Sequence, residues 1–155
     1  MFIKAINPKN APEALGPYSP AVKLGDFVYL SGQIPLDPKT GEIVGDTIQE
    51  QTHQVMKNIN AVLSEMGLGF HHIVKTTIFV KDLGDFDELN KVYASYLTQP
   101  YPARSCVEVA RLPKDVRVEI ECMVIDTLAY EAQMVEQEEG CSNCSGGCGC
   151  HGCGE

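Results

Sequence analysis

Two alternating runs between residues 102 and 125 carry the side chains best suited to chemistry. Arg104 and Cys106 fall on one face of the first run, because successive side chains of a strand point to opposite faces. Glu119 and Glu121 fall on the polar face of the second run. A guanidinium group can hold a planar carboxylate by two parallel hydrogen bonds, and a nearby glutamate can move a proton or position a water molecule. The pattern points to a site for a small organic acid.

The same residues have a structural interpretation, a solvated sheet face on which arginine and glutamate pair across strands. Taken alone, this stretch favours that structural interpretation. Cys106 raises the further alternative of a thiol nucleophile. No histidine is placed to activate that thiol in the predicted arrangement, which favours a pocket-lining role for Cys106.

The composition indicates one ordinary globular domain. The chain has 155 residues, of which 44% are hydrophobic and 21% charged, and its formal net charge is −9. This acidic balance, without a basic stripe, argues against a nucleic-acid partner. No apolar run approaches the roughly 20 residues that span a bilayer, so no membrane partner is expected. No secretory signal is visible at the start, and a cytoplasmic protein is therefore expected.

Hydrophobic periodicity predicts the elements that must position Arg104 and Glu119. Strands are expected at residues 2–6, in a hairpin at 21–34, at 71–81, and in the two runs on either side of a turn at 112–115. Amphipathic helices are expected at 46–66 and within 82–97, where Asp85 and Glu88 resemble a capping box. The order β, β, β, α, β, α, β, β predicts an α+β domain. Its two helices should cover one face of a mixed sheet of about six strands.

The second face of the predicted sheet is the expected location of the site. Arg104 and Cys106 are placed on it together with Ser31 and Glu119, among apolar side chains such as Tyr29. This face is too apolar to meet bulk water as a whole. Self-association should bury it and leave clefts between subunits.

Several motifs, in order along residues 2–127, resemble the Rid family of reactive-intermediate imine deaminases, also called the YjgF-type family. They are GPYS at 16–19, SGQ at 31–33, VKTTIFVKDL at 74–83, Asn90 with Tyr93, PARSCVEVARLP at 102–113 and VEIE at 118–121. The resemblance implies a chorismate-mutase-like fold and a homotrimer with sites between neighbouring subunits. It also implies hydrolysis of 2-imino or 2-enamino acids, such as 2-iminopropanoate and 2-iminobutanoate, to 2-oxo acids and ammonia, without a cofactor.

The resemblance also implies roles for individual residues. Arg104 corresponds to a clamp for the substrate carboxylate, and Glu119 to the group that orients or activates the attacking water. The remaining substrate-binding residues implied are Tyr18, Ser31, Asn90 and Cys106. The alternative function is a non-catalytic small-molecule-binding or holdase-chaperone trimer. The pairing of Arg104 with Glu119 favours the deaminase.

Residues 129–155 depart from the family and form a separate segment after a domain at 1–128. The segment is acidic and then rich in glycine and cysteine, without the apolar pattern that builds a core. Its candidate metal ligands are Cys141, Cys144, Cys148, Cys150, His151 and Cys153. Two Cys-x-x-Cys pairs separated by five residues suit a metallothionein-like site for zinc or another soft ion. A disordered redox-active tail and an iron–sulfur site are the alternatives.

His71 and His72 form another pair of potential metal ligands. They stand at the entrance of a predicted strand, where adjacent side chains diverge. We therefore expect the pair to be a poor chelate.

Overall fold

Six strands form one mixed sheet in the computed structural model, which describes residues 2–134 of the chain. The strands are β1 (Ile3–Ile6), β2 (Ala21–Leu24), β3 (Phe27–Gln33), β4 (Ile73–Val80), β5 (Ala103–Glu108) and β6 (Val118–Ile125). The α-helices are α1 (Ile48–Ser64) and α2 (Phe86–Ser95), and the 3₁₀ turns are η1 (Phe70–His72), η2 (Leu83–Asp85) and η3 (Pro113–Asp115). The order of elements is the one predicted from periodicity.

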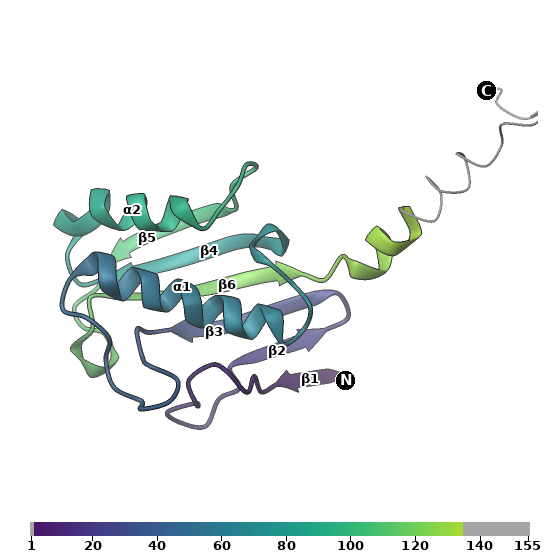
Figure 1. The fold of residues 1–155 in the computed structure, drawn as a ribbon, viewed down its shortest axis with the longest axis horizontal. Helices are drawn as coiled ribbons and strands as arrows, with labels where there is room; N and C mark the ends of the chain where they lie inside the picture. Colours follow the sequence, from purple (N-terminus) through teal and green to yellow (C-terminus); the bar gives the residue numbers. More distant parts are fainter. Residues whose placement is uncertain (1, 135–155) are drawn as a thin grey trace, which may run out of the picture.

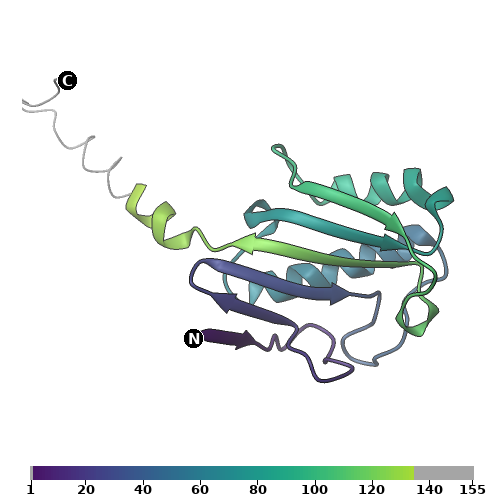
Figure 2. The same cartoon turned by 180° about the vertical axis from the view of Figure 1, so that it is seen from behind.

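The strands lie in the order β1-β2-β3-β6-β4-β5. Neighbouring strands are antiparallel except β4 and β5, which are parallel and are joined through α2. A parallel pair needs such a crossover, because the chain must return to the same end of the sheet. Both helices cover the same face of the sheet (Figure 1), and the reverse view shows no described helix over the other face (Figure 2). We call these the helix face and the open face.

The main core lies between α1 and the helix face. Its fully buried members include Val55 and Ile59 of α1 and Ile78 and Ile120 of the sheet. Burying such side chains contributes about 1.5–3 kcal/mol each before entropy is counted, so the apolar stripe of α1 fixes that helix on the sheet. The predicted helical periodicity of this stripe is confirmed.

Thr47 caps α1 through a full capping box with Glu50. The Thr47 hydroxyl accepts a hydrogen bond from the Glu50 amide at 3.3 Å, and the Glu50 carboxylate accepts one from the Thr47 amide at 3.1 Å. After the helix, Gly67 adopts a φ of 73°, a left-handed conformation that glycine adopts without steric cost. The helix predicted over residues 46–66 is therefore confirmed, and it begins and ends two residues inside that range.

The capping box predicted at Asp85 and Glu88 is wrong. Asp85 makes no capping hydrogen bond; its carboxylate instead accepts one from Arg117 at 3.0 Å. Asp85 has a ψ of 1°, whereas a capping residue needs an extended backbone. The turn η2 precedes α2 directly, and the extended residue Asp82 accepts a hydrogen bond from the Gly84 amide at 2.7 Å. The cap therefore lies three residues earlier than predicted.

The first residues of the predicted tail are helical. Residues 128–134 form a short helical segment, yellow-green in Figure 1, that extends away from the end of β6. The Tyr130 hydroxyl donates to the Asp26 carboxylate at 2.8 Å, which ties this segment to the turn between β2 and β3. None of the described helices has the length and apolar character needed to cross a membrane.

Candidate active site

Arg104 lies on the edge strand β5, beside α2. The parallel register places it opposite Thr76, a buried residue whose hydroxyl is 2.8 Å from that of Tyr93. One guanidinium nitrogen donates to the Asn90 side-chain oxygen at 2.6 Å. The guanidinium carbon also lies 5.3 Å from the ring centre of Tyr93 and 5.4 Å from that of Phe86, within cation–π range. Helix α2 thus holds the arginine head in one place.

A cavity of about 440 Å³ opens beside this arginine. Its lining residues are Asn90, Tyr93, Ala94, Tyr101, Pro102 and Arg104. Asn90 is the one hydrogen-bond acceptor that the guanidinium meets among the described residues. A guanidinium carries five N–H donors, so donors remain for a ligand carboxylate in this cavity.

Glu119 lies on the open face of β6. It pairs with Phe79 of β4, whose other neighbour is Val107 of β5. An ideal Cβ built on Gly32 would lie only 1.9 Å from Glu119 Oε1, so the carboxylate rests directly against the glycine backbone. Partial burial raises the pKa of Glu119, and the charge of Glu121 raises it further. A carboxyl group with a raised pKa is suited to proton transfer.

Tyr18 and Ser31 lie close to this glycine. Tyr18 and Gly32 line the same small pocket, and Ser31 precedes Gly32 in the chain. The Ser31 hydroxyl donates to the Ser19 carbonyl at 2.7 Å, which fastens β3 to the proline-rich loop. The Tyr18 hydroxyl accepts from the Leu15 amide at 3.1 Å while its ring stays half-exposed. The loop therefore holds the Tyr18 side chain beside Gly32.

The prediction that Arg104 and Cys106 share the open face with Ser31 and Glu119 is wrong. Cys106 pairs with the fully buried Ile78 and packs against the main core, so both β5 residues belong to the helix face. Alternation distinguishes the two faces of one strand. The register between two strands decides which face of one strand continues a given face of its neighbour, and the sequence does not reveal that register.

The surroundings of Cys106 do not favour the thiolate form. Burial raises its pKa, and the nearby charge of Arg104 opposes this more weakly. A nucleophilic cysteine needs the reverse, a lowered pKa that supplies thiolate. Cys106 is not among the residues that line the cavity beside Arg104, so its pocket-lining role stays a prediction.

The predicted site residues therefore form two groups within one chain. The Arg104 group consists of Asn90, Tyr93, Arg104 and Cys106, and the Glu119 group consists of Tyr18, Ser31, Gly32 and Glu119. The groups lie on opposite faces of the sheet, with β4 between the strands that carry Arg104 and Glu119. The cysteine and histidine ligands predicted at residues 141–153 lie outside the described residues.

Sequence reasoning missed two contacts. One is the aromatic support of Arg104 by Phe86 and Tyr93 of α2. The other is the contact between Gly32 and Glu119. A glycine inside a strand is the sequence signal that could indicate such a close approach, but it does not identify the approaching group.

Comparison with known proteins identifies relatives over nearly the whole domain. Residues 8–126 match the family model described as Endoribonuclease L-PSP. A protein named 2-iminobutanoate/2-iminopropanoate deaminase from Salmonella typhimurium is 50% identical over 125 residues, 79% of this chain and 97% of that protein. A RutC family protein from Pyrococcus horikoshii is 51% identical over 115 residues, 74% of this chain and 91% of that one.

Solved structures agree with the sequence relatives. The crystal structure of Escherichia coli TdcF with bound serine has a TM-score of 0.75 and 46% identity, and the match covers 79% of this chain and 98% of that chain. Structural neighbours of this kind share the chorismate-mutase-like fold, which confirms the predicted fold class. The chain therefore belongs to the Endoribonuclease L-PSP family, the family of the YjgF and Rid proteins, as its motifs indicated.

Proposed function

We propose that this protein hydrolyses short 2-imino acids, such as 2-iminobutanoate and 2-iminopropanoate, to 2-oxo acids and ammonia. The observation that carries the proposal is Arg104, whose guanidinium is fixed by Asn90 and Tyr93 and faces a cavity with donors to spare. An anchored guanidinium selects ligands that carry a carboxylate. Relatives at about half identity that are named imine deaminases support the same substrate class.

The proposed reaction needs few protein groups because a protonated imine is already electrophilic. Arg104 holds the substrate carboxylate, and Glu119 takes a proton from a water molecule as the water oxygen bonds to the imine carbon. Glu119 then returns that proton to the nitrogen of the tetrahedral intermediate. The carbon–nitrogen bond breaks, ammonia leaves, and loss of the hydroxyl proton completes the 2-oxo acid. We assign no step to a cofactor.

We further propose that the complete site forms between neighbouring subunits of a homotrimer. The Arg104 group and the Glu119 group lie on opposite faces of one chain, so another chain must bring the missing group to each. The open face also exposes Phe27, Tyr29 and Val107 by between 42% and 48%. An apolar patch of this kind typically marks an association surface. Burial between subunits would also shield the reaction site from bulk water.

Replacing Arg104 by alanine tests the proposal. We expect Arg104→Ala to lower kcat/KM by about 30-fold to several thousand-fold, since losing one partner of a desolvated charge pair costs about 2–5 kcal/mol. The assay follows ammonia or 2-oxo acid release when the protein is added to a serine or threonine dehydratase reaction. Lys57→Ala, which removes a positive charge from the exposed side of α1, is the matched control.

Two outcomes would contradict the deaminase. Wild-type protein that does not accelerate ammonia release would leave a non-catalytic binding trimer or holdase as the better function for the same cavity. Arg104→Ala with the rate of wild type would remove Arg104 from the site. Circular dichroism of each variant shows whether the fold is kept.

A further inference from the structure

We propose that His71, His72 and Glu131 bind one divalent metal ion of the zinc class. These residues lie away from the Arg104 and Glu119 groups, at the junction of α1, β4 and the helical segment 128–134. Each offers one ligand atom, and the three atoms lie within 4.8 Å of one another. Two imidazoles and a carboxylate are a ligand set that zinc commonly takes.

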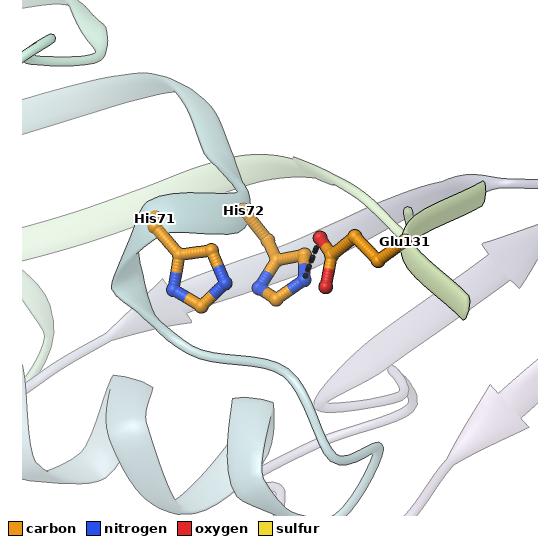
Figure 3. A group of neighbouring side chains, drawn as sticks. All are labelled: His71, His72 and Glu131. Atoms are coloured by element: carbon orange, nitrogen blue, oxygen red, sulfur yellow. Dashed lines mark ion pairs between the residues drawn. The ribbon is translucent and has the colours of Figure 1, made fainter. Parts of the chain in front are cut away.

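The two histidines face the same side because they lie in the 3₁₀ turn η1. Their ring centres are 3.9 Å apart and the rings are tilted by 42°. Figure 3 shows the rings side by side, with Glu131 reaching toward them from the C-terminal segment. The expectation that the pair diverges was wrong, since β4 begins only at Ile73. In a 3₁₀ turn, adjacent side chains are rotated by about 120° rather than by the 180° of a strand.

His72 carries the second, independent observation. Its side chain is 2% exposed, and its Nε2 is a buried nitrogen that lacks a hydrogen-bond partner among the described residues. This nitrogen points toward Glu131, whose Oε1 lies 3.4 Å away. An unsatisfied buried polar atom costs about 1–3 kcal/mol, and a bound ion would give this nitrogen a closer partner than the Glu131 oxygen and offset part of that cost.

The other ring nitrogen of His72 can stabilise either tautomer. The Gly69 amide donates a hydrogen bond to Nδ1 at 3.0 Å, and the Gly69 carbonyl oxygen lies 3.3 Å from the same nitrogen. Binding of a metal at Nε2 would place the proton on Nδ1, so the bond from the amide would be lost and Nδ1 would donate to the carbonyl instead. A hydrogen bond of this kind fixes ring orientation at most histidine metal sites.

The remaining two ligands have room to adjust. Zinc–nitrogen and zinc–oxygen bonds are about 2.0–2.2 Å long, so the three atoms must move closer together on binding. His71 is exposed and the Glu131 side chain is 49% exposed, so both can move without disturbing the core. Thr127 donates a hydrogen bond to Glu131 Oε1 at 2.5 Å and keeps the carboxylate near His72. Three protein ligands leave one coordination position for water or another donor.

A metal here would fasten the C-terminal segment to the start of β4. The competing explanation is a direct ion pair between protonated His72 and Glu131, which needs no metal. The two explanations differ in the role of His71, since the ion pair does not require it. His71 is therefore the most informative residue to substitute.

The test uses full-length protein in which the five tail cysteines are replaced by serine, so that tail thiols cannot bind the metal. Zinc affinity is measured by competition with a chromophoric chelator, and zinc per chain by mass spectrometry. We expect one zinc per chain, and at least about tenfold weaker binding in His71→Ala and in Glu131→Gln. His53→Ala and Glu42→Gln, which alter an exposed histidine and an exposed glutamate elsewhere, should bind zinc as the parent does.

Thermal unfolding gives a second readout. Zinc should raise the melting temperature of the parent, because it binds the folded state, and should raise it less in His71→Ala and Glu131→Gln. Equal zinc affinity in the parent and both variants, or no zinc bound by the parent, would overturn the proposal. Retained zinc binding in His71→Ala alone would also overturn it, since His71 would then not be a ligand.

Discussion

Glu119 and Arg104 lie in opposite environments, and each environment suits the role proposed for the residue. The Arg104 head is exposed, charged and held by Asn90, which suits it to grip an anion. The Glu119 carboxyl is partly buried against Gly32, and burial disfavours its charged form. A fixed cation and a carboxyl with a raised pKa are a reasonable pair for anchoring an acid and moving a proton.

The raised pKa of Glu119 predicts the pH dependence of the reaction. The base must be ionised, so kcat/KM should fall as the pH drops through a pKa that lies above the ordinary 4.5. This fall at low pH is the acidic limb of the pH–rate profile. Glu119→Gln should lower kcat by about 10²–10⁴-fold and remove the acidic limb. The measurement is a pH–rate profile of both proteins in the presence of a saturating dehydratase.

Glu121→Gln is the matched control for that profile. Glu121 is exposed, and its charge helps to raise the pKa of Glu119. Removing this charge should move the acidic limb to lower pH while the maximal rate is kept. An acidic limb that persists unchanged in Glu119→Gln would assign it to another group and would contradict the role of Glu119.

At the scale of the elements, Asn58 connects α1 to the chain that follows β3. Its buried side chain donates to the carbonyls of Ile34 and Leu36, each at 3.0 Å, and accepts a hydrogen bond from Gln54 at 2.9 Å. This contact holds the end of the strand that carries Ser31. The amide therefore links the core helix to the Glu119 group.

Asn58→Ala should destabilise the protein. The carbonyls of Ile34 and Leu36 would each lose one of two donors, because the Leu36 amide still donates to Ile34 and the Gln54 side chain to Leu36. Loss of these two hydrogen bonds predicts a decrease of about 1–3 kcal/mol in the free energy of unfolding. Asn60→Ala, at an exposed position of the same helix, should change it by less than about 0.5 kcal/mol. Urea unfolding at one fixed protein concentration measures both. Equal stability of the two variants would show that the Asn58 contacts are not needed.

The elements themselves were predictable, but the matching of their faces was not. Alternation correctly separated buried Val28 and Leu30 from exposed Phe27 and Tyr29 in β3, because each strand shows its own period. The face of β5 depends on its parallel register with β4. That register is a long-range property, which short-range patterns do not contain.

The candidate site was predicted in its residues but not in its arrangement. Motif resemblance named Arg104 and Glu119, and strand alternation alone then placed them on one face. The prediction that the side chains of His71 and His72 diverge was wrong for a related reason, because the start of β4 was predicted two residues too early. Errors of one or two residues at element ends are common. Here such an error at the start of β4 led to the expectation that His71 and His72 would be a poor chelate.

At the scale of the whole molecule, the open face should be an association surface. Val107→Glu would place a charge on exposed apolar surface of β5, and we expect it to dissociate the proposed trimer and abolish the proposed imine hydrolysis together. Sedimentation velocity measures the assembly and the dehydratase-coupled assay measures the rate. Lys57→Glu, on the exposed side of α1, should alter neither. A Val107→Glu protein that is monomeric and fully active would contradict the shared site.

The sharing of one site by two subunits is tested most directly by complementation. Arg104→Ala and Glu119→Gln chains, each of which should keep at most a few per cent of the activity, are unfolded, mixed in equal amounts and refolded together. If each site takes Arg104 from one chain and Glu119 from its neighbour, about one quarter of the sites in random trimers receive both intact residues. The mixture should therefore regain about a quarter of the wild-type rate of imine hydrolysis. Mixed trimers that stay as inactive as either variant alone would contradict the account.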